Sequence, residues 1–159
     1  MKFQHENRYD ASPADVVALQ TDEAYRSSLK SRTRSAGHSV SVTEQGAATV
    51  VEVDQRLKTQ GIPSFAQKLV GDTIQLVQRE EWTGNHATFE LTIPGKPGHL
   101  RGTVVVEPDG AGAVERVSGE AKASIPLVGG KIEKLLVDMV TQSLERSQER
   151  GAAWLAGER

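Results

Sequence analysis

The hydrophobic pattern is clearest near the C-terminal end of the chain, where apolar residues recur every three or four positions. From Lys131 to about Leu155 these residues fall on one side of a helical period, and charged or amide side chains fall on the other. Such a pattern is typical of an amphipathic helix, which here would be about 37 Å long. The apolar stripe comprises Ile132, Leu135, Leu136, Met139, Val140 and Leu144. A stripe of this length needs a broad surface to cover it.

Most of the chain before this helix alternates between apolar and polar residues with a period of two, which predicts strands. Turn sequences rich in Gly, Pro and Asp separate the segments, so consecutive strands should be antiparallel. The expected strands are Lys2–Tyr9, His38–Val42, Thr49–Val53, Thr73–Trp82, Ala87–Ile93, Leu100–Glu107 and Val114–Ile125.

Short helical segments interrupt the strands at two places. After the first strand we expect a helix over Pro13–Gln20 with Ser12 as its N-cap, and a second one over residues 21–29. Ser64 is expected to cap a short turn of helix over Phe65–Leu69. That apolar turn is either a lid over a cavity or a small cluster packed under its own loop.

The last strand carries small residues on the face that should point inward, which would let the final helix approach the sheet closely. They are Val117, Gly119, Ala121 and Ala123. The glycine pair Gly129-Gly130 would let the chain reverse from strand to helix. These elements predict a single α+β domain over residues 1–159, a seven-stranded antiparallel sheet curved around the long C-terminal helix, with two short helices after the first strand. A curved sheet of this kind usually leaves a cavity beneath the helix.

Composition narrows the possible functions. The chain has 19 Lys and Arg against 21 Asp and Glu, which does not suggest a nucleic-acid partner, and it lacks cysteine, which excludes disulfides and thiolate chemistry. No apolar run approaches the roughly 18 residues of a spanning helix, and the N-terminus has no signal-peptide core, so a cytoplasmic protein is expected. The histidines have no metal-ligand spacing, so neither a metal site nor a cofactor is predicted. They are His5, His38, His86 and His99.

The predicted order of elements resembles the helix-grip fold of START lipid-transfer domains, birch-pollen-allergen-like proteins and polyketide cyclases. Several motifs further resemble a bacterial START-like family of uncharacterised function. They are Met1-Lys2-Phe3, Arg8-Tyr9-Asp10-Ala11, Ile62-Pro63-Ser64-Phe65, Glu80-Glu81-Trp82, Ile93-Pro94-Gly95-Lys96-Pro97 and Ile125-Pro126-Leu127-Val128-Gly129-Gly130-Lys131. The resemblance implies binding of lipids, polyketides or other apolar molecules, with enzymes in a minority of branches.

Our first hypothesis is therefore a non-enzymatic protein that binds a small hydrophobic molecule between the helix and the sheet. Apolar side chains would supply the burial energy and a few polar ones would orient the ligand. The candidates have inward strand parity or lie at the centre of the helix stripe. They are His5, Asn7, Tyr9, Leu76, Gln78, Trp82, Phe89, Leu91, Leu100, Leu135, Leu136 and Met139.

Two alternatives stay open. An enzyme of the cyclase or hydratase kind would use polar cavity residues, and the pair His5 and Glu80 is the plausible acid–base couple. Against this, Glu80 could simply lie near the solvent end of its strand. The other alternative is a domain with a filled interior that binds a protein partner. Near the C-terminus, Trp154 is expected to pack the helix against the sheet. The oligomeric state stays open, although the strand His38–Val42 is the expected exposed edge.

Overall fold

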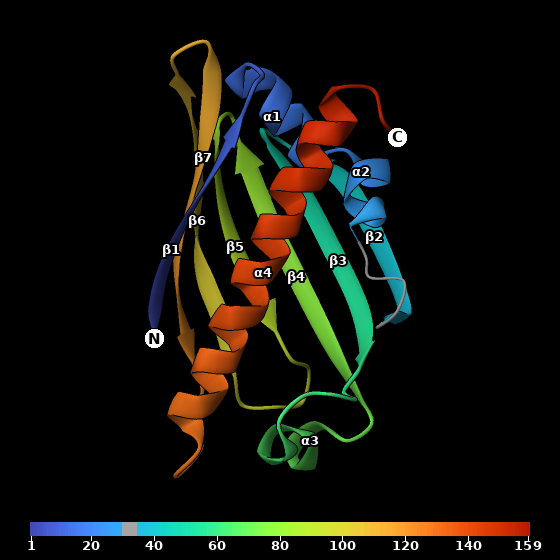
Figure 1. Cartoon of the computed structure of the whole chain (residues 1–159), viewed down its shortest axis with the longest axis vertical. Helices are drawn as coiled ribbons and strands as arrows, with labels where there is room; N and C mark the ends of the chain where they lie inside the picture. The colour runs from blue at the N-terminus through green and yellow to red at the C-terminus, as the bar shows by residue number, and fades with distance from the viewer. Residues whose placement is uncertain (30–34) are drawn as a thin grey trace.

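One long helix lies across one face of a seven-stranded antiparallel sheet (Figure 1). The computed structural model describes residues 1–29 and 35–159. The strands are β1 (Lys2–Tyr9), β2 (Ser35–Gln45), β3 (Ala48–Lys58), β4 (Thr73–Thr83), β5 (His86–Thr92), β6 (His99–Asp109) and β7 (Gly112–Lys122). The helices are α1 (Pro13–Gln20), α2 (Glu23–Ser28), α3 (Ser64–Val70) and α4 (Gly129–Leu155). The sheet order is β1-β7-β6-β5-β4-β3-β2, which confirms the predicted α+β helix-grip architecture.

The three short helices lie at opposite ends of α4. Figure 1 shows α3 close to the first turns of α4, whereas α1 and α2 flank its C-terminal half. The predicted cap of α1 is confirmed, because Ser12 Oγ accepts a hydrogen bond from the Asp15 amide at 3.1 Å. The predicted cap of α3 is wrong. Ser64 is the first residue of the helix, and Pro63 precedes it without a side-chain cap.

Two boundaries near α4 differ from the sequence prediction. Strand β7 ends at Lys122 rather than Ile125, because the Ala123 amide donates to the Glu133 carboxylate on α4 instead of continuing the ladder. Helix α4 begins at Gly129, two residues earlier than Lys131. A Cβ atom on Gly129 would lie 2.5 Å from the Ala123 carbonyl oxygen, so the close approach of helix start and strand end requires glycine.

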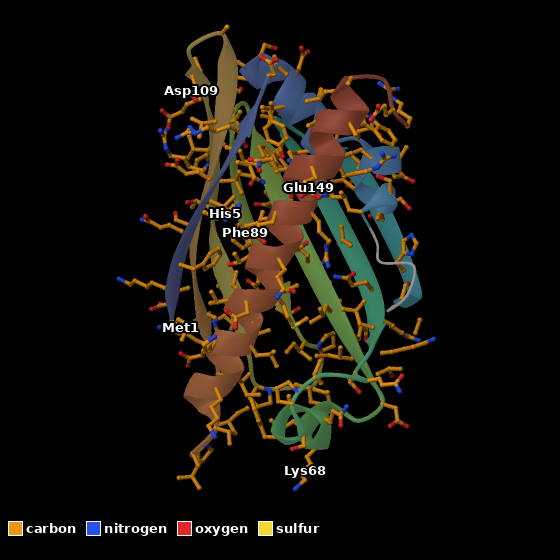
Figure 2. All side chains as sticks on the ribbon, viewed as in Figure 1. Met1, His5, Lys68, Phe89, Asp109 and Glu149 are labelled. Atoms are coloured by element: carbon orange, nitrogen blue, oxygen red, sulfur yellow. The ribbon has the colours of Figure 1, made fainter. Side chains whose placement is uncertain are left out.

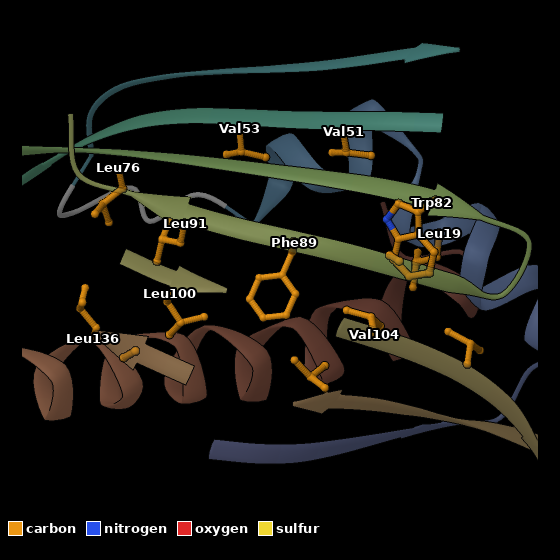
Figure 3. Packing of buried hydrophobic residues seen from close by; sticks show 14 of the residues in the cluster. Leu19, Val51, Val53, Leu76, Trp82, Phe89, Leu91, Leu100, Val104 and Leu136 are labelled. Atoms are coloured by element: carbon orange, nitrogen blue, oxygen red, sulfur yellow. The ribbon is translucent and has the colours of Figure 1, made fainter. Parts of the chain in front are cut away.

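Packing against α4 follows the pattern of small residues on β7. Ala121 is fully buried, and Ala123 and Val117 are nearly so. At the other end of the helix the Trp154 ring meets the Tyr25 ring edge-on, with centroids 5.6 Å apart. Trp154 therefore packs as expected, but this ring contact is with α2 rather than with the sheet. Figure 3 shows the aliphatic and aromatic side chains that fill the space between the sheet and the helix.

The two edges of the sheet are β1 and β2. The expected edge strand is therefore confirmed, although β2 extends beyond His38–Val42 at both ends. Among residues 1–29 and 35–159, no helix combines the length and the apolar composition needed to cross a bilayer.

Candidate functional site

Two internal cavities lie end to end beneath α4. The first, called here the apolar cavity, has a volume of about 80 Å³ and lies between α3 and the first half of α4. Its walls are almost entirely aliphatic, and they include Ile62, Leu69, Ile74, Ile93, Leu135 and Met139. Such walls favour the apolar part of a ligand, because there is little polar surface to desolvate.

The second cavity, called here the polar cavity, has a volume of about 100 Å³ and lies under the second half of α4. One part of its wall is apolar and includes Phe89, Leu91 and Val140. The same cavity is also lined by three ionisable side chains, Arg26, Glu80 and Glu115, all of them buried. Buried charges at an internal cavity are costly unless they are paired, so their partners decide what the cavity can do.

Arg26 and Glu80 form a buried salt bridge. Arg26 Nη1 donates to Glu80 Oε1 at 2.8 Å, and Nη2 donates to Oε2 at 2.6 Å. Trp82 Nε1 and Gln78 Nε2 also donate to this carboxylate. Burial alone would raise the pKa of Glu80, but the Arg26 charge and these hydrogen bonds hold the pKa below its usual range. Glu80 is thus a fixed anion that is a poor proton acceptor.

Glu115 on β7 is different, because no cation of the protein pairs with it within residues 1–29 and 35–159. Asn7 on β1 donates to Glu115 Oε1 from 3.4 Å, a long contact. The same Asn7 amide group makes a shorter bond, 3.0 Å, to the Leu144 carbonyl on α4. Burial, and next the negative charge of Glu80, raise the pKa of Glu115 to about 7. Glu115 therefore changes its charge near neutral pH.

A group of tyrosine and serine side chains lies beside this cluster. Tyr25 donates its hydroxyl to the Ser147 carbonyl at 2.8 Å, whereas the buried Tyr9 hydroxyl has no hydrogen-bond partner in the described part of the chain. Burial raises the pKa of both tyrosines, so both rings stay neutral.

The twelve candidate residues divide among four places. Gln78, Trp82, Phe89 and Leu91 line the polar cavity, and Leu135, Leu136 and Met139 line the apolar cavity. Leu76 and Leu100 line neither, and both are buried. On β4, Leu76 lies between Ile74 of the apolar cavity and Gln78 of the polar one, and it is one of the buried side chains between the sheet and the helix (Figure 3).

The remaining candidates, His5, Asn7 and Tyr9, line neither cavity. Their parity was interpreted correctly for Asn7 and Tyr9, which are buried, while His5 is half-buried. Figure 2 shows His5 on β1, the strand at the edge of the sheet. His5 Nε2 donates to Asn7 Oδ1 at 2.7 Å. Asn7 in turn lies beside Glu115, its register partner on β7, and neither His5 nor Asn7 lines the cavity.

The structure contradicts both hypotheses about Glu80. It is not paired with His5, since His5 bonds to Asn7 and Glu80 bonds to Arg26. It is also not at a solvent end, because only 4% of it is exposed.

Two residues of the cluster were missed in the sequence. Glu115 shares its strand parity with Val117, so the alternation of β7 already placed it inward. Arg26 lies on a six-residue helix that is too short to show which face is buried. Within the described residues, no group of three His, Cys, Asp or Glu side chains is arranged to hold a metal ion.

Comparisons with known proteins agree with the geometry. An antiparallel sheet that grips a C-terminal helix is also the fold of solved START superfamily and ARO/CYC structures. The family described as "Protein of unknown function (DUF2505)" matches residues 4–155, and the chain belongs to this family. No curated protein matches the chain.

Similar solved structures share the fold at low sequence identity. A protein from Thermus thermophilus is 23% identical with a TM-score of 0.63, over 94% of this chain and 96% of that one. A START superfamily protein from Mycobacterium smegmatis is 13% identical with a TM-score of 0.63, over 97% and 98%. The di-domain ARO/CYC StfQ from the steffimycin biosynthetic pathway is 11% identical with a TM-score of 0.66, over 96% of this chain and 50% of StfQ.

Proposed function

We propose that the protein binds a small hydrophobic molecule between α4 and the sheet, with the apolar part of that molecule in the apolar cavity. The observation that carries this proposal is an internal space with aliphatic walls beneath the long helix. Leu135 and Met139 form its roof, and Ile74 and Ile93 form its floor. A small molecule is favoured over a nucleic acid because the chain carries a net charge of -2.

The volume limits the ligand that fits without rearrangement. An engineered apolar cavity of about 150 Å³ accepts benzene, and typical ligand pockets measure about 300–1,000 Å³. At about 80 Å³ the apolar cavity holds only a very small group as it stands. A larger ligand requires that one wall move, or that buried side chains between the two cavities, such as Leu76, move and connect them.

Helix α3 is the part of the cavity wall that we expect to move, because it belongs to a segment held together by its own hydrogen bonds. The segment from Thr59 to Asp72 is closed at its base, since the Thr59 amide donates to the Asp72 carbonyl at 3.0 Å. Within the segment, Gln67 Nε2 donates to the Thr59 carbonyl at 2.7 Å. Because these bonds are internal, the segment can shift as a unit without breaking them. The Phe65 ring contacts α4 through the Lys131 ammonium, 5.6 Å from the ring centroid.

Direct binding tests the proposal. Purified protein is analysed by native mass spectrometry for retained small molecules, and labelled protein is titrated with toluene, naphthalene and decanoic acid by NMR. We expect shifts concentrated in residues of the apolar cavity. The proposal fails if nothing is retained and none of the probes shifts these residues.

A matched pair of variants locates the site. Leu135→Phe adds volume inside the apolar cavity, whereas Leu155→Phe makes the same change at the exposed last residue of α4. We expect Leu135→Phe to weaken binding at least tenfold and Leu155→Phe to leave it unchanged. Equal affinities in the two variants would place the ligand elsewhere.

A further inference from the structure

The ionisable side chains at the polar cavity do not balance in charge. Arg26 carries one positive charge, and Glu80 carries one negative charge that this arginine neutralises. Glu115 adds a second carboxyl group to the same wall. When Glu115 is ionised, the wall is one positive charge short.

Arg26 cannot serve both carboxylates. Its two terminal nitrogens are bound to the two oxygens of Glu80, and Nη1 also donates to the Gln20 carbonyl at 3.0 Å. Arg26 thus has a fixed orientation toward Glu80. Its positive charge lowers the pKa of Glu115 without a direct bond, and the remaining favourable contacts of Glu115 come from the neutral Asn7 and Gln20 side chains.

Within residues 1–29 and 35–159, the groups beside Glu115 supply no cation besides Arg26. Helices α1 and α4 add the neutral Gln20, Leu144 and Ser147 to the wall of the same cavity. Strand β1 presents Asn7 and the neutral Tyr9, and α2 presents the neutral Tyr25 along with Arg26. Strand β4 presents Glu80, which repels a second negative charge. On β6, the residue paired with Glu115 is Val106. Among the described residues, the carboxyl group is therefore a buried acceptor without a cation of its own, and a ligand in the cavity can supply one.

Some residues around this wall are exposed or half-buried, so a ligand can reach it. Ser143 on α4 lines the same cavity and is exposed, and Gln78 and Leu29 are half-buried. The apolar side of the cavity, with Phe89 and Leu91, suits a hydrocarbon group attached to the charged one.

We propose that the polar cavity is a recognition site for a protonated amine, whose nitrogen binds Glu115 and whose hydrocarbon part lies against Phe89 and Leu91. This inference rests on the proposed function, because it names the chemical class of the ligand in the space beneath α4. The amine supplies the missing positive charge beside a carboxyl group that is almost fully buried, where such a pair is stronger than at the surface.

Binding of the amine is then linked to the proton of Glu115. A cation and a proton compete for the same carboxylate, so the amine binds the ionised form. With a pKa of about 7, Glu115 is mostly ionised at pH 8 and mostly protonated at pH 6. Affinity for an amine should thus rise with pH across this range, whereas affinity for a neutral analogue should not.

Three probes with the same five-membered carbon ring test the proposal, namely cyclopentylamine, cyclopentanol and cyclopentane. Each is titrated into the whole protein by NMR at pH 6 and pH 8. We expect cyclopentylamine to bind at least tenfold more tightly than cyclopentanol at pH 8, and to lose most of this advantage at pH 6. Shifts should appear at Glu115, Phe89 and Val140.

Two variants assign the effect to one carboxyl group. Glu115→Gln keeps the shape and removes the charge, and it should abolish the preference for the amine at both pH values. Glu145→Gln makes the same change on the exposed face of α4, and this variant should keep the preference for the amine. The thermal melting curve of each variant establishes that it is folded.

The outcomes separate the two proposals. If the amine and the alcohol bind equally at pH 8, or if Glu115→Gln keeps the preference, the amine site is wrong while hydrophobic binding stands. The same holds if the alcohol binds more tightly than the amine. If none of these probes binds and toluene, naphthalene and decanoic acid also fail, the proposed function itself is wrong, and the amine site is wrong with it.

Discussion

Arg26 on α2 and Glu80 on β4 are 54 residues apart in the chain, yet two hydrogen bonds of 2.8 and 2.6 Å join their terminal groups. Both side chains are almost fully buried. The pair ties the helical corner after β1 to the middle of the sheet and forms one wall of the polar cavity. Breaking a buried pair leaves an uncompensated charge, which costs far more than breaking an exposed one.

The first prediction concerns this pair. Glu80→Gln should lower the free energy of unfolding by about 3–5 kcal/mol, because the buried Arg26 would lose the negative charge to which both of its terminal nitrogens are bound. The matched control is Glu81→Gln on the outer face, where Glu81 meets Arg79 at 2.7 Å in an exposed contact. The control should cost at most about 1 kcal/mol. Urea unfolding at pH 7 measures both, and equal losses would contradict a dominant role for the buried pair.

The second prediction concerns the pH dependence of stability. The pKa of Glu115 is about 7 in the folded protein against an ordinary value of 4.5, so the folded state retains a proton that the unfolded chain has lost. Stability should then fall as pH rises from about 4.5 to about 7 and level off above it. At 1.36 kcal/mol per pKa unit, the full effect is about 3 kcal/mol.

Glu115→Gln should remove this part of the pH dependence, since Gln resembles the protonated acid. Above pH 7 the variant should be more stable than the wild type by up to about 3 kcal/mol. Urea unfolding from pH 4.5 to 8.5 gives both profiles, with Glu145→Gln as the exposed control. Parallel profiles for the wild type and Glu115→Gln would show that Glu115 does not titrate near neutral pH.

The third prediction concerns two glycines of α4. A Cβ atom on Gly151 would lie 2.9 Å from the Tyr9 ring and 3.1 Å from the Tyr25 hydroxyl, whereas one on Gly130 would meet nothing within 4 Å. Gly151→Ala should therefore destabilise the protein by about 1–3 kcal/mol through overpacking. Gly130→Ala should be neutral or stabilise it by up to about 1 kcal/mol. Thermal unfolding distinguishes them, and a stabilising Gly151→Ala would contradict the close packing of α4 on Tyr9.

The fourth prediction concerns the residue between the two cavities. Leu76→Ala should cost about 2–5 kcal/mol and should join the apolar and polar cavities into one larger space. Affinity for naphthalene should increase at least fivefold as a result. Leu19→Ala is the control, because Leu19 is equally buried but lies on α1, away from the strand face that carries Ile74 and Gln78. A gain in affinity in both variants would mean that loosened packing, rather than the joined cavity, is responsible.

The sequence by itself determined the order of the elements and most of their faces. The three- and four-residue period after Lys131 identified α4, and the small residues at Ala121 and Ala123 identified the strand beneath it. These are local signals, because each depends on the period of one element, so they can be detected without knowing the rest of the chain. The parity of β4 likewise placed Gln78 and Trp82 toward the helix.

Only the tertiary structure decided which polar groups meet. Glu80 could pair with His5 or face solvent on sequence grounds, and it pairs with Arg26 because α2 folds back over the sheet. Asn7 is bound to the Leu144 carbonyl on α4, which leaves Glu115 with a weak partner. Such pairings depend on where elements distant in sequence come to rest, and the period of a strand or a helix contains no information about this. The same reason explains why alternation placed Leu76 inside but could not show that one cavity lies toward Ile74 and another toward Gln78.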